Sequence, residues 1–340
     1  MAVEPLPEEP LPDRVTLTAV AERLAAISGA PTRLDDLDLH LGDGRGSVTL
    51  EERFAVAAER LGLDDLERAV LAAVALRDLA PELASSLAEL APAAQGGGAT
   101  TRAVARLLAG PGVSVSDVLG VLGPGQCLRG LGAVRMAAGA PDTALADRPL
   151  VLADRLAAML LGAPIDDPGA NGTLRRVGRS ALPFGRAETL SQLTGLLRVE
   201  DMPRPPIAVH GPDAAQAIAN AAGCGLLCVA AGALADPELA RDAVLAATLE
   251  GRVLVVDRLS ELAAADRVTL PDRLALLPEA VLCLGGPDEL AVLENVPAVA
   301  VPVALPSAQE RAELWSVALG GMEVPADISG APHNLTCTFG

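Results

Sequence analysis

The most telling absence in this 340-residue chain is lysine, which occurs nowhere in it. Aromatic residues are almost as scarce, with no tyrosine, three phenylalanines and one tryptophan. Because the phosphate-binding loop of ATPases needs a lysine between the β and γ phosphates, this chain cannot hydrolyse ATP through such a loop of its own. An alanine-rich composition without lysine is typical of a GC-rich genome, and we expect an actinobacterial source.

Positive charge is also in short supply, because the formal net charge is −18 and the isoelectric point is near 4.5. A field of that sign repels nucleic acids and anionic membranes at long range. The densest basic cluster is Arg175, Arg176 and Arg179, in a glycine-containing stretch that we interpret as a solvated linker. We therefore do not expect a nucleic-acid partner. With 51% hydrophobic and 21% charged residues, the chain is expected to fold into globular domains.

Neither a secretory signal nor a membrane span is evident. The N-terminus is acidic and proline-rich, without a basic or an apolar region. The longest uncharged run, residues 217–235, contains Asn220 and several glycines, which gain little in lipid. We expect no membrane association, and five reduced cysteines in the cytoplasm. No histidine lies near Cys224 and Cys228, so we predict no metal site and interpret both as buried small side chains.

The first half of the chain is predicted to be helical. Residues 1–13 are expected to be a disordered tail, and residues 14–162 a helical, winged-helix-like domain. Thr49 with Glu52 has the spacing of a capping box, and Asp64 is placed to cap the next helix. The predicted helices are 14–27, one from Thr49, one from Asp64, one from Ala80, one from Thr100 or Thr101, 116–122, and one that ends at Leu161.

A two-stranded element is expected late in this domain. Residues 127–136 indicate a turn into a short strand, and residues 147–152 can return antiparallel to it. Short helices followed by two strands are the layout of a winged helix, which binds DNA in some proteins and other proteins elsewhere. Because the chain is acidic and no helix is studded with arginine, we favour protein contacts.

The second half alternates strands and helices. Residues 163–184 have little apolar periodicity and are predicted to be a linker, and residues 321–340 an irregular tail. Near-continuous apolar strands between amphipathic helices predict an α/β three-layer domain with a parallel sheet over 185–320. The predicted strands are 207–210, 226–229, 253–256, 280–284 and 299–303. The predicted helices are 185–199, 213–222, 237–249, 270–277 and 307–319.

A degenerate phosphate-binding loop lies between the first of these strands and the helix after it. The motif GxxxxGK[ST] corresponds to residues 211–218. Gly211 and Pro212 fit this motif. In contrast, Gln216, Ala217 and Ile218 stand where glycine, lysine and the magnesium-binding hydroxyl belong. Only the amides at the helix N-terminus remain, so ATP and magnesium are expected to bind weakly at most.

The strand that ends at Asp257 has the form of a Walker B strand. Arg258 stands where a catalytic glutamate would polarise water, and the stretch after the next strand, 283–287, offers no polar sensor side chain. We interpret Asp257 as a loop cap or an ion-pair partner. We expect no catalytic residue and no metal ligand in the chain.

These features resemble one family, the AAA ATPases encoded with contractile injection systems, which are phage-tail-like particles. The resemblance covers about residues 15–320. Five stretches carry it: Glu52–Leu63, Leu66–Arg68, Leu79–Leu83, the helix start Thr100–Leu108, and the helix with Arg311 and Trp315 that follows the last strand. In that family, a winged-helix domain precedes a degenerate AAA-like module, and an intact ATPase module follows. No such module follows here, and the changed texture of residues 330–340 suggests a truncation or a shifted reading frame.

The resemblance implies a cytoplasmic, catalytically silent scaffold or assembly module. Its partners would be proteins, either in an AAA-type homo- or hetero-oligomer or among the components of an injection particle. Two other functions remain open at this point. The chain can be an AAA subunit that binds nucleotide without hydrolysing it, or a winged-helix regulator that binds DNA.

Overall fold

The chain divides into two compact units, Met1–Asp166 and Asp167–Gly340. The computed structural model describes residues 15–28, 48–91, 99–108, 113–137, 143–163, 173–179, 186–198, 205–211, 213–274, 277, 281–285, 287–305, 307, 309–311 and 316. None of the helices within these ranges is long and apolar enough to cross a membrane.

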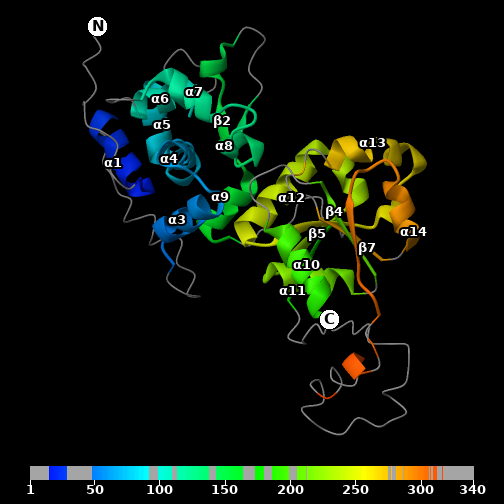
Figure 1. Ribbon diagram of the computed structural model, residues 1–340. Coiled ribbons are helices and arrows are strands. Elements are labelled where there is room, and N and C mark those ends of the chain that lie inside the picture. Colours follow the sequence, from blue (N-terminus) through cyan, green and yellow to red (C-terminus); the bar gives the residue numbers. More distant parts are fainter. Residues whose placement is uncertain are drawn as a thin grey trace. The chain divides into compact units, whose positions relative to one another are not determined.

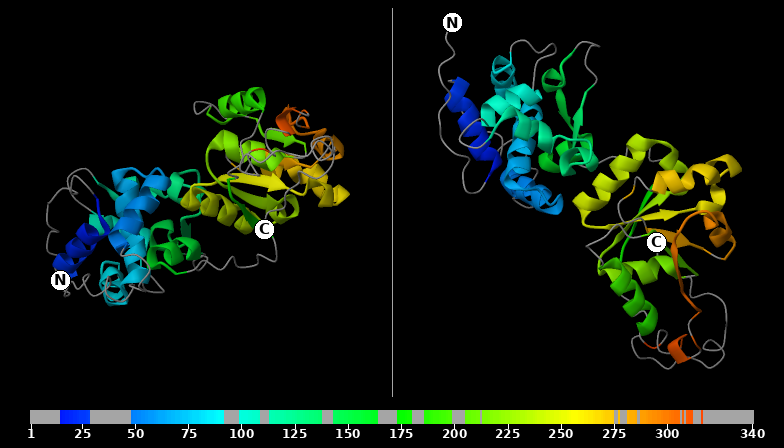
Figure 2. Two further views of the ribbon diagram at one scale, coloured as in Figure 1. Left: turned by 90° about the horizontal axis from the view of Figure 1, so that it is seen from below. Right: turned by 45° about the horizontal axis from the view of Figure 1, so that its top comes forward.

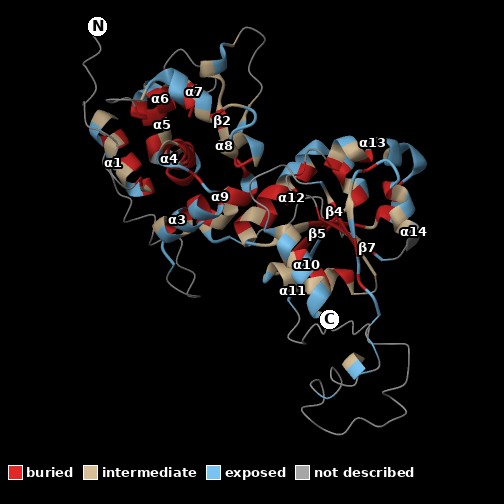
Figure 3. Ribbon diagram, in the orientation of Figure 1, coloured by how far each residue is buried: buried red, intermediate tan, exposed pale blue. Residues whose placement is uncertain are grey.

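The first unit is built around helix α4 (Asp65–Leu79), as Figures 1 and 3 show. Ten of its residues are buried, on all sides of the helix. A helix that is apolar all round must be enclosed by others, and α4 contacts α1, α5, α6, α7 and α9. The surrounding helices are α1 (Leu17–Ser28), α3 (Leu50–Arg60), α5 (Pro81–Glu89), α6 (Thr101–Leu108), α7 (Val115–Val121), α8 (Cys127–Gly130) and α9 (Asp154–Leu161).

The helix starts follow from local side-chain hydrogen bonds. The Thr49 hydroxyl accepts from the Glu52 N–H and the Glu52 carboxylate accepts from the Thr49 N–H, which confirms the predicted capping box. Asp64 caps α4 as predicted. The start of α7 differs from the prediction, because its cap is Ser114 rather than Ser116. Asp117, three residues beyond Ser114, completes a capping box there.

A two-stranded antiparallel sheet completes the first unit. Strand β1 (Val134–Met136) pairs with β2 (Leu150–Leu152), and Val134 lies opposite Leu152. A short 3-10 helix, η1 (Leu145–Asp147), precedes β2. The predicted strand pair is confirmed. The winged-helix assignment stays a prediction, since helices followed by a strand pair occur in other folds as well.

The second unit contains a six-stranded sheet in the order β3-β5-β6-β7-β4-β8. Five strands are parallel, and only the edge strand β3 runs antiparallel to its neighbour. The predicted α/β domain is therefore confirmed, while the sheet is parallel, as predicted, in all its strands except β3. The strands are β3 (Leu174–Val177), β4 (Ile207–His210), β5 (Leu226–Ala230), β6 (Val253–Asp257), β7 (Val281–Leu284) and β8 (Val299–Pro302).

Helices cover both faces of this sheet. From β4 to β5 the chain moves across the sheet in one direction, and from β5 to β6 it moves back. Right-handed crossovers therefore put α11 (Ala214–Ala222) and α12 (Pro237–Glu250) on opposite faces. Helix α10 (Ala187–Leu197) packs beside α11. Figures 1 and 2 show the sheet between its two layers of helices. Further helices are α13 (Ala264–Leu274) and α14 (Pro287–Leu290), with 3-10 helices η2 (Ala231–Ala235), η3 (Leu259–Glu261) and η4 (Ala291–Leu293).

In the second unit, β3 and α13 differ from the sequence prediction. The segment predicted as a linker, 163–184, contains strand β3, which joins the sheet by pairing with β5. Helix α13 begins at Ala264, six residues before the predicted start, because the prediction followed apolar residues and only Leu270 and Leu274 of this helix are buried. Most of the predicted helix 307–319 and all of the predicted tails 1–13 and 321–340 lie outside the described residues.

Candidate functional site

The candidate site lies where β4, β6 and β7 end, because parallel sheets with helices on both faces bind ligands at the carboxyl ends of their strands. Gly211 follows β4, Asp257 ends β6 and Gly285 follows β7. All three positions belong to the stretches in which the sequence predicted a degenerate nucleotide site. Their neighbours decide whether this edge can accept a phosphate or a metal ion.

Gly211 is required by contacts within the protein. Its φ is 134°, a backbone conformation that side chains rarely adopt, and a Cβ added there would collide with the Val303 carbonyl. The Gly211 N–H donates to the Leu284 carbonyl at 3.1 Å, and the Val303 N–H donates to the His210 carbonyl at 2.7 Å. The close approach that a glycine permits is thus used by the strand ends themselves. Pro212 lies outside the described residues.

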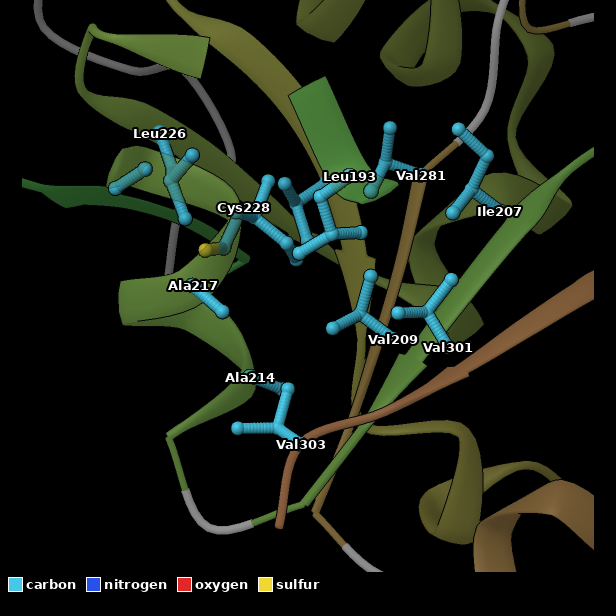
Figure 4. Packing of buried hydrophobic residues seen from close by; sticks show 13 residues of the cluster. Leu193, Ile207, Val209, Ala214, Ala217, Leu226, Cys228, Val281, Val301 and Val303 are labelled. Atoms are coloured by element: carbon cyan, nitrogen blue, oxygen red, sulfur yellow. The ribbon is translucent and has the colours of Figure 1, made fainter. Parts of the chain in front are cut away.

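The position that would carry the lysine is part of the apolar core. Ala217 and Ile218 are fully buried, in a cluster that includes Val209, Cys228 and residues of several other strands. Figure 4 shows Ala217 facing this cluster. Gln216 is half-buried, and its Nε2 has no hydrogen-bond partner among the described residues. The side chains at the last two motif positions therefore pack against the sheet.

A carboxylate stands at the N-terminus of α11. Asp213 precedes the first residue of the helix, and its Oδ2 is 2.9 Å from Nη2 of Arg186. A negative charge at this end interacts favourably with the helix dipole. The pair occupies the place at which a helix of this kind would present free amides to a phosphate. The Arg186 side chain is 10% exposed and that of Asp213 is 31% exposed, so the arginine is the better shielded partner.

Asp257 is buried and paired with arginines. The residue is 7% exposed, and its Oδ2 accepts a hydrogen bond from Nη2 of Arg175 at 2.9 Å. The Nε of Arg258 lies 3.7 Å from the other carboxylate oxygen. Arg258 has a φ of 57°, and no other non-glycine residue in the described ranges has a positive φ. The Oδ1 atom of Asp257 has no hydrogen-bond partner among the described residues, but the two arginines offset the negative charge that would attract a divalent cation.

A third carboxylate closes the edge between β6 and β7. Glu289 accepts hydrogen bonds from the Ser260 N–H at 3.1 Å and from the Gly285 N–H at 2.6 Å. Partial burial raises the pKa of Glu289, but these hydrogen bonds outweigh it and hold the pKa below its ordinary value. Glu289 is therefore ionised at neutral pH. It occupies backbone donors that could otherwise bind an anion.

The two cysteines on the same face of the sheet as Asp257 are inert. Cys228 lies on β5 and Cys283 on β7. Burial raises the pKa of Cys228 to about 11 and that of Cys283 to about 12. Both therefore remain protonated at neutral pH and are weak nucleophiles. Across the described part of the chain, no cluster of histidine, cysteine and acidic side chains is suited to a metal ion.

The residues at this edge do not fit ATP with magnesium. The Gly211 and Gly285 amides and the Oδ2 atom of Asp257 already have partners within the chain. The carboxylates of Asp213 and Glu289 add negative charge that would repel a phosphate. Sequence reasoning placed Asp257 and Gly211 at this edge but missed Arg186, Asp213 and Glu289. No local signal could have found the pairs, since Arg175 and Asp257 are 82 residues apart in the chain.

Many arginines in the described part of the first unit make hydrogen bonds within the unit. Several of its arginines donate to carbonyl groups of the unit itself, among them Arg23 to Leu107 and Arg77 to Leu150. On α6, Arg102 is paired with Asp147. The other arginines of this kind are Arg53, Arg68, Arg106 and Arg129.

Comparison with known proteins gives little further guidance. No protein-family model matches the chain, and no curated protein matches it. Among solved structures, it is similar to a chain in the structure of the E. coli MS115-1 HORMA:CdnC:Trip13 complex. The identity is 14% and the TM-score 0.28, over 46% of this chain and 77% of that chain. A similarity this weak establishes neither a shared fold nor a shared function.

Proposed function

We propose that this chain is a non-catalytic scaffold or assembly module of the AAA type, linked to contractile injection particles, without a working Walker A site. It acts in the cytoplasm through protein partners, in an AAA-type oligomer or with particle components. It needs no cofactor. The observation that carries the loss of the nucleotide site is the pairing of its anion- and metal-binding positions with side chains of the chain itself.

The order of the parallel strands supports the AAA-like part of this proposal. Numbered along the chain from β4 to β8, these strands lie in the order 2-3-4-1-5. The strand that leads to Gly211 is thus separated by one strand, β7, from the strand that ends at Asp257. AAA-type modules have the same separation between the strand before the phosphate loop and the strand with the acidic residue.

The ion pairs support the loss of nucleotide binding. Phosphate binding at α11 would bring negative charge next to Asp213, and metal binding at Asp257 would have to displace Arg175. Opening either pair leaves a shielded charge without its counter-ion, because the Arg186 and Asp257 side chains are each only 10% exposed. The cost is smaller than for a fully buried pair, since the partners Asp213 and Arg175 are 31% and 53% exposed. Opening either pair therefore works against nucleotide binding.

Calorimetry with ATP and magnesium tests the proposal. We expect no heat of binding up to millimolar nucleotide, and a dissociation constant below about 1 mM would refute the proposal.

A variant tests the role of Asp213. Asp213→Ala removes the carboxylate at the N-terminus of α11 and is expected to raise the affinity for inorganic phosphate until binding becomes measurable. Asp272→Ala changes the same charge at an exposed position of α13 and serves as the matched control. Equal phosphate binding by both variants would contradict the role assigned to Asp213.

The scaffold role is tested by its partners. We expect the purified chain to form an oligomer in light scattering, or to co-sediment with purified contractile particles. A chain that remains monomeric and does not co-sediment at micromolar concentration would refute the assembly role. A DNA-binding function is disfavoured by the internal use of the arginines in the first unit. Fluorescence anisotropy with duplex DNA at low salt should show no binding, since electrostatic binding is strongest there.

A further inference from the structure

Strand β3 is an addition to the parallel sheet rather than a part of its strand-helix alternation. It pairs antiparallel with the outer edge of β5, whereas α10, the next helix in the chain, packs against α11 and β8. Four residue pairs join β3 to β5, and one step further the Ala230 N–H donates to the Thr173 carbonyl at 3.1 Å. The segment that follows the first unit in the chain is thus attached to the edge of the second unit's sheet that is opposite β8.

The apolar contribution to this attachment is small. Leu174 is the only buried residue of β3, and Val177 is half-buried. The two residues between them, Arg175 and Arg176, are exposed. A short edge strand with so little apolar surface is not held by the hydrophobic effect alone.

Charged contacts provide the rest of the attachment. Arg176 binds the Glu250 carboxylate through both Nε and Nη2, at distances of 2.7–3.1 Å. Arg252 donates to the same carboxylate at 2.9 Å, and its Nη1 reaches the Val177 carbonyl at 3.4 Å. Glu250 therefore bridges an arginine of β3 to an arginine next to β6. Such a bidentate pair within a network is stronger than an isolated surface pair.

The second charged contact crosses the face of the sheet. Arg175 reaches over β5 to Asp257 at the end of β6, with 2.9 Å between Nη2 and Oδ2. The Arg175 side chain is 53% exposed, while that of Asp257 is 10% exposed. The pair thus links an accessible, removable cation to a shielded carboxylate at the candidate site.

We propose that β3 is a releasable strap, a strand whose hold on the β5 edge depends on its arginine–carboxylate pairs in addition to its backbone hydrogen bonds. Its release lengthens the connection between the two units by the 12 residues from Leu174 to Gly185, up to Arg186, which stays paired with Asp213. In extended form these add roughly 40 Å of reach. Release also uncovers the outer edge of β5 and the Asp257 carboxylate. The length of the connection between the units and the exposure of the Asp257 carboxylate would thus both depend on the arginine–carboxylate pairs of β3.

Hydrogen exchange at two neighbouring amides provides a direct test. The Ala230 N–H points to β3, whereas by the alternation of an extended strand the Val229 N–H points to β6. In the variant Arg175→Gln/Arg176→Gln, we expect exchange at Ala230 to become at least fivefold faster, with Val229 unchanged. Arg179→Gln removes an exposed arginine just beyond β3 and is the matched control.

Salt and a milder variant complete the experiment. Raising the salt concentration to about 1 M shortens the screening length to about 3 Å. At that concentration, the Ala230 amide of the wild-type protein should exchange nearly as fast as that of the double variant. Arg176→Gln alone leaves Asp257 paired with Arg175 and should still make exchange at Ala230 about twofold faster. The proposal is refuted if Ala230 exchanges at the wild-type rate in the double variant, or if Val229 accelerates equally. Equal acceleration would mean that the charges stabilise the whole unit rather than the strap.

Discussion

Restoring the lysine at its motif position should destabilise the second unit rather than create a nucleotide site. Ala217 is fully buried and packs in the cluster below β4 and β5. A lysine there has to enter that cluster or push α11 away from the sheet. The variant Ala217→Lys therefore distinguishes two cases: position 217 is part of the apolar core, or it faces a phosphate site that lacks only its lysine.

The expected cost follows from the ionisation of the buried amine. A lysine in such surroundings has a pKa of about 5–6, against about 10.4 in the unfolded chain. Keeping the amine neutral at pH 7 then costs roughly 4.6 kcal/mol, at about 1.4 kcal/mol for each pH unit below 10.4. Overpacking adds about 1–3 kcal/mol. The sum is comparable with the whole stability of a typical domain.

The stability of the Ala217→Lys variant should increase with pH. Because the pKa is lower in the folded state, the unfolded variant binds more protons between about pH 6 and pH 10. The stability of Ala217→Lys relative to the wild type should therefore rise by about 1.4 kcal/mol per pH unit over that range and level off above it. Urea unfolding, followed by circular dichroism at several pH values, measures this difference.

Two matched variants separate charge from size and place. Ala217→Met adds similar volume without charge, so it should show only the overpacking cost and no pH dependence. Ala222→Lys puts the same side chain at the half-exposed C-terminal end of α11 and should change stability by less than about 1 kcal/mol. If Ala217→Lys has the stability of the wild type, or binds ATP, position 217 faces a ligand site and the reasoning fails.

Three further predictions rest on single positions. Gly211→Ala should lower the free energy of unfolding by at least about 2 kcal/mol, because it combines a strained φ with a collision at the next strand. Hydrogen bonds from Arg102 hold the pKa of Asp147 below its usual value, so the stability from this pair should be present at neutral pH and lost as the pH falls through that pKa. Cys228 and Cys283, with pKa values raised to about 11 and about 12, should resist thiol reagents at pH 8 until the protein unfolds.

Each of these predictions has a control. Gly195→Ala, on α10 with open space at its Cβ, should stabilise the protein by about 0.4–1 kcal/mol, and a loss there equal to that at Gly211 would remove the strain argument. Asp147→Asn should flatten the acid limb of the unfolding curve, and an unchanged limb would contradict the pairing. Labelling of Cys283 in the native protein as fast as in urea would show that this thiol is accessible.

Local patterns determined most of the elements. Strand β4 has the predicted bounds, because a short apolar run between proline and glycine leaves few alternatives. The capping boxes of α3 and α4 were likewise predictable, since the participating residues lie three apart in the chain. The absence of lysine also followed directly from the sequence, and with it the absence of a phosphate-binding loop of the usual kind.

Only the tertiary structure decided what replaced that loop. Arg175 was predicted to be in a solvated linker, yet it lies in strand β3 and pairs with Asp257, 82 residues away. The Leu-Arg-Arg-Val segment carries no pattern of its own, and its strand conformation depends on the free edge of β5. Likewise, Arg186 finds Asp213 only once α10 is packed beside α11. Composition and periodicity record which side chains are present and which face is apolar. The distance between two charges depends on how the whole sheet is assembled, and that distance determines whether a carboxylate can bind a metal or is already paired with an arginine.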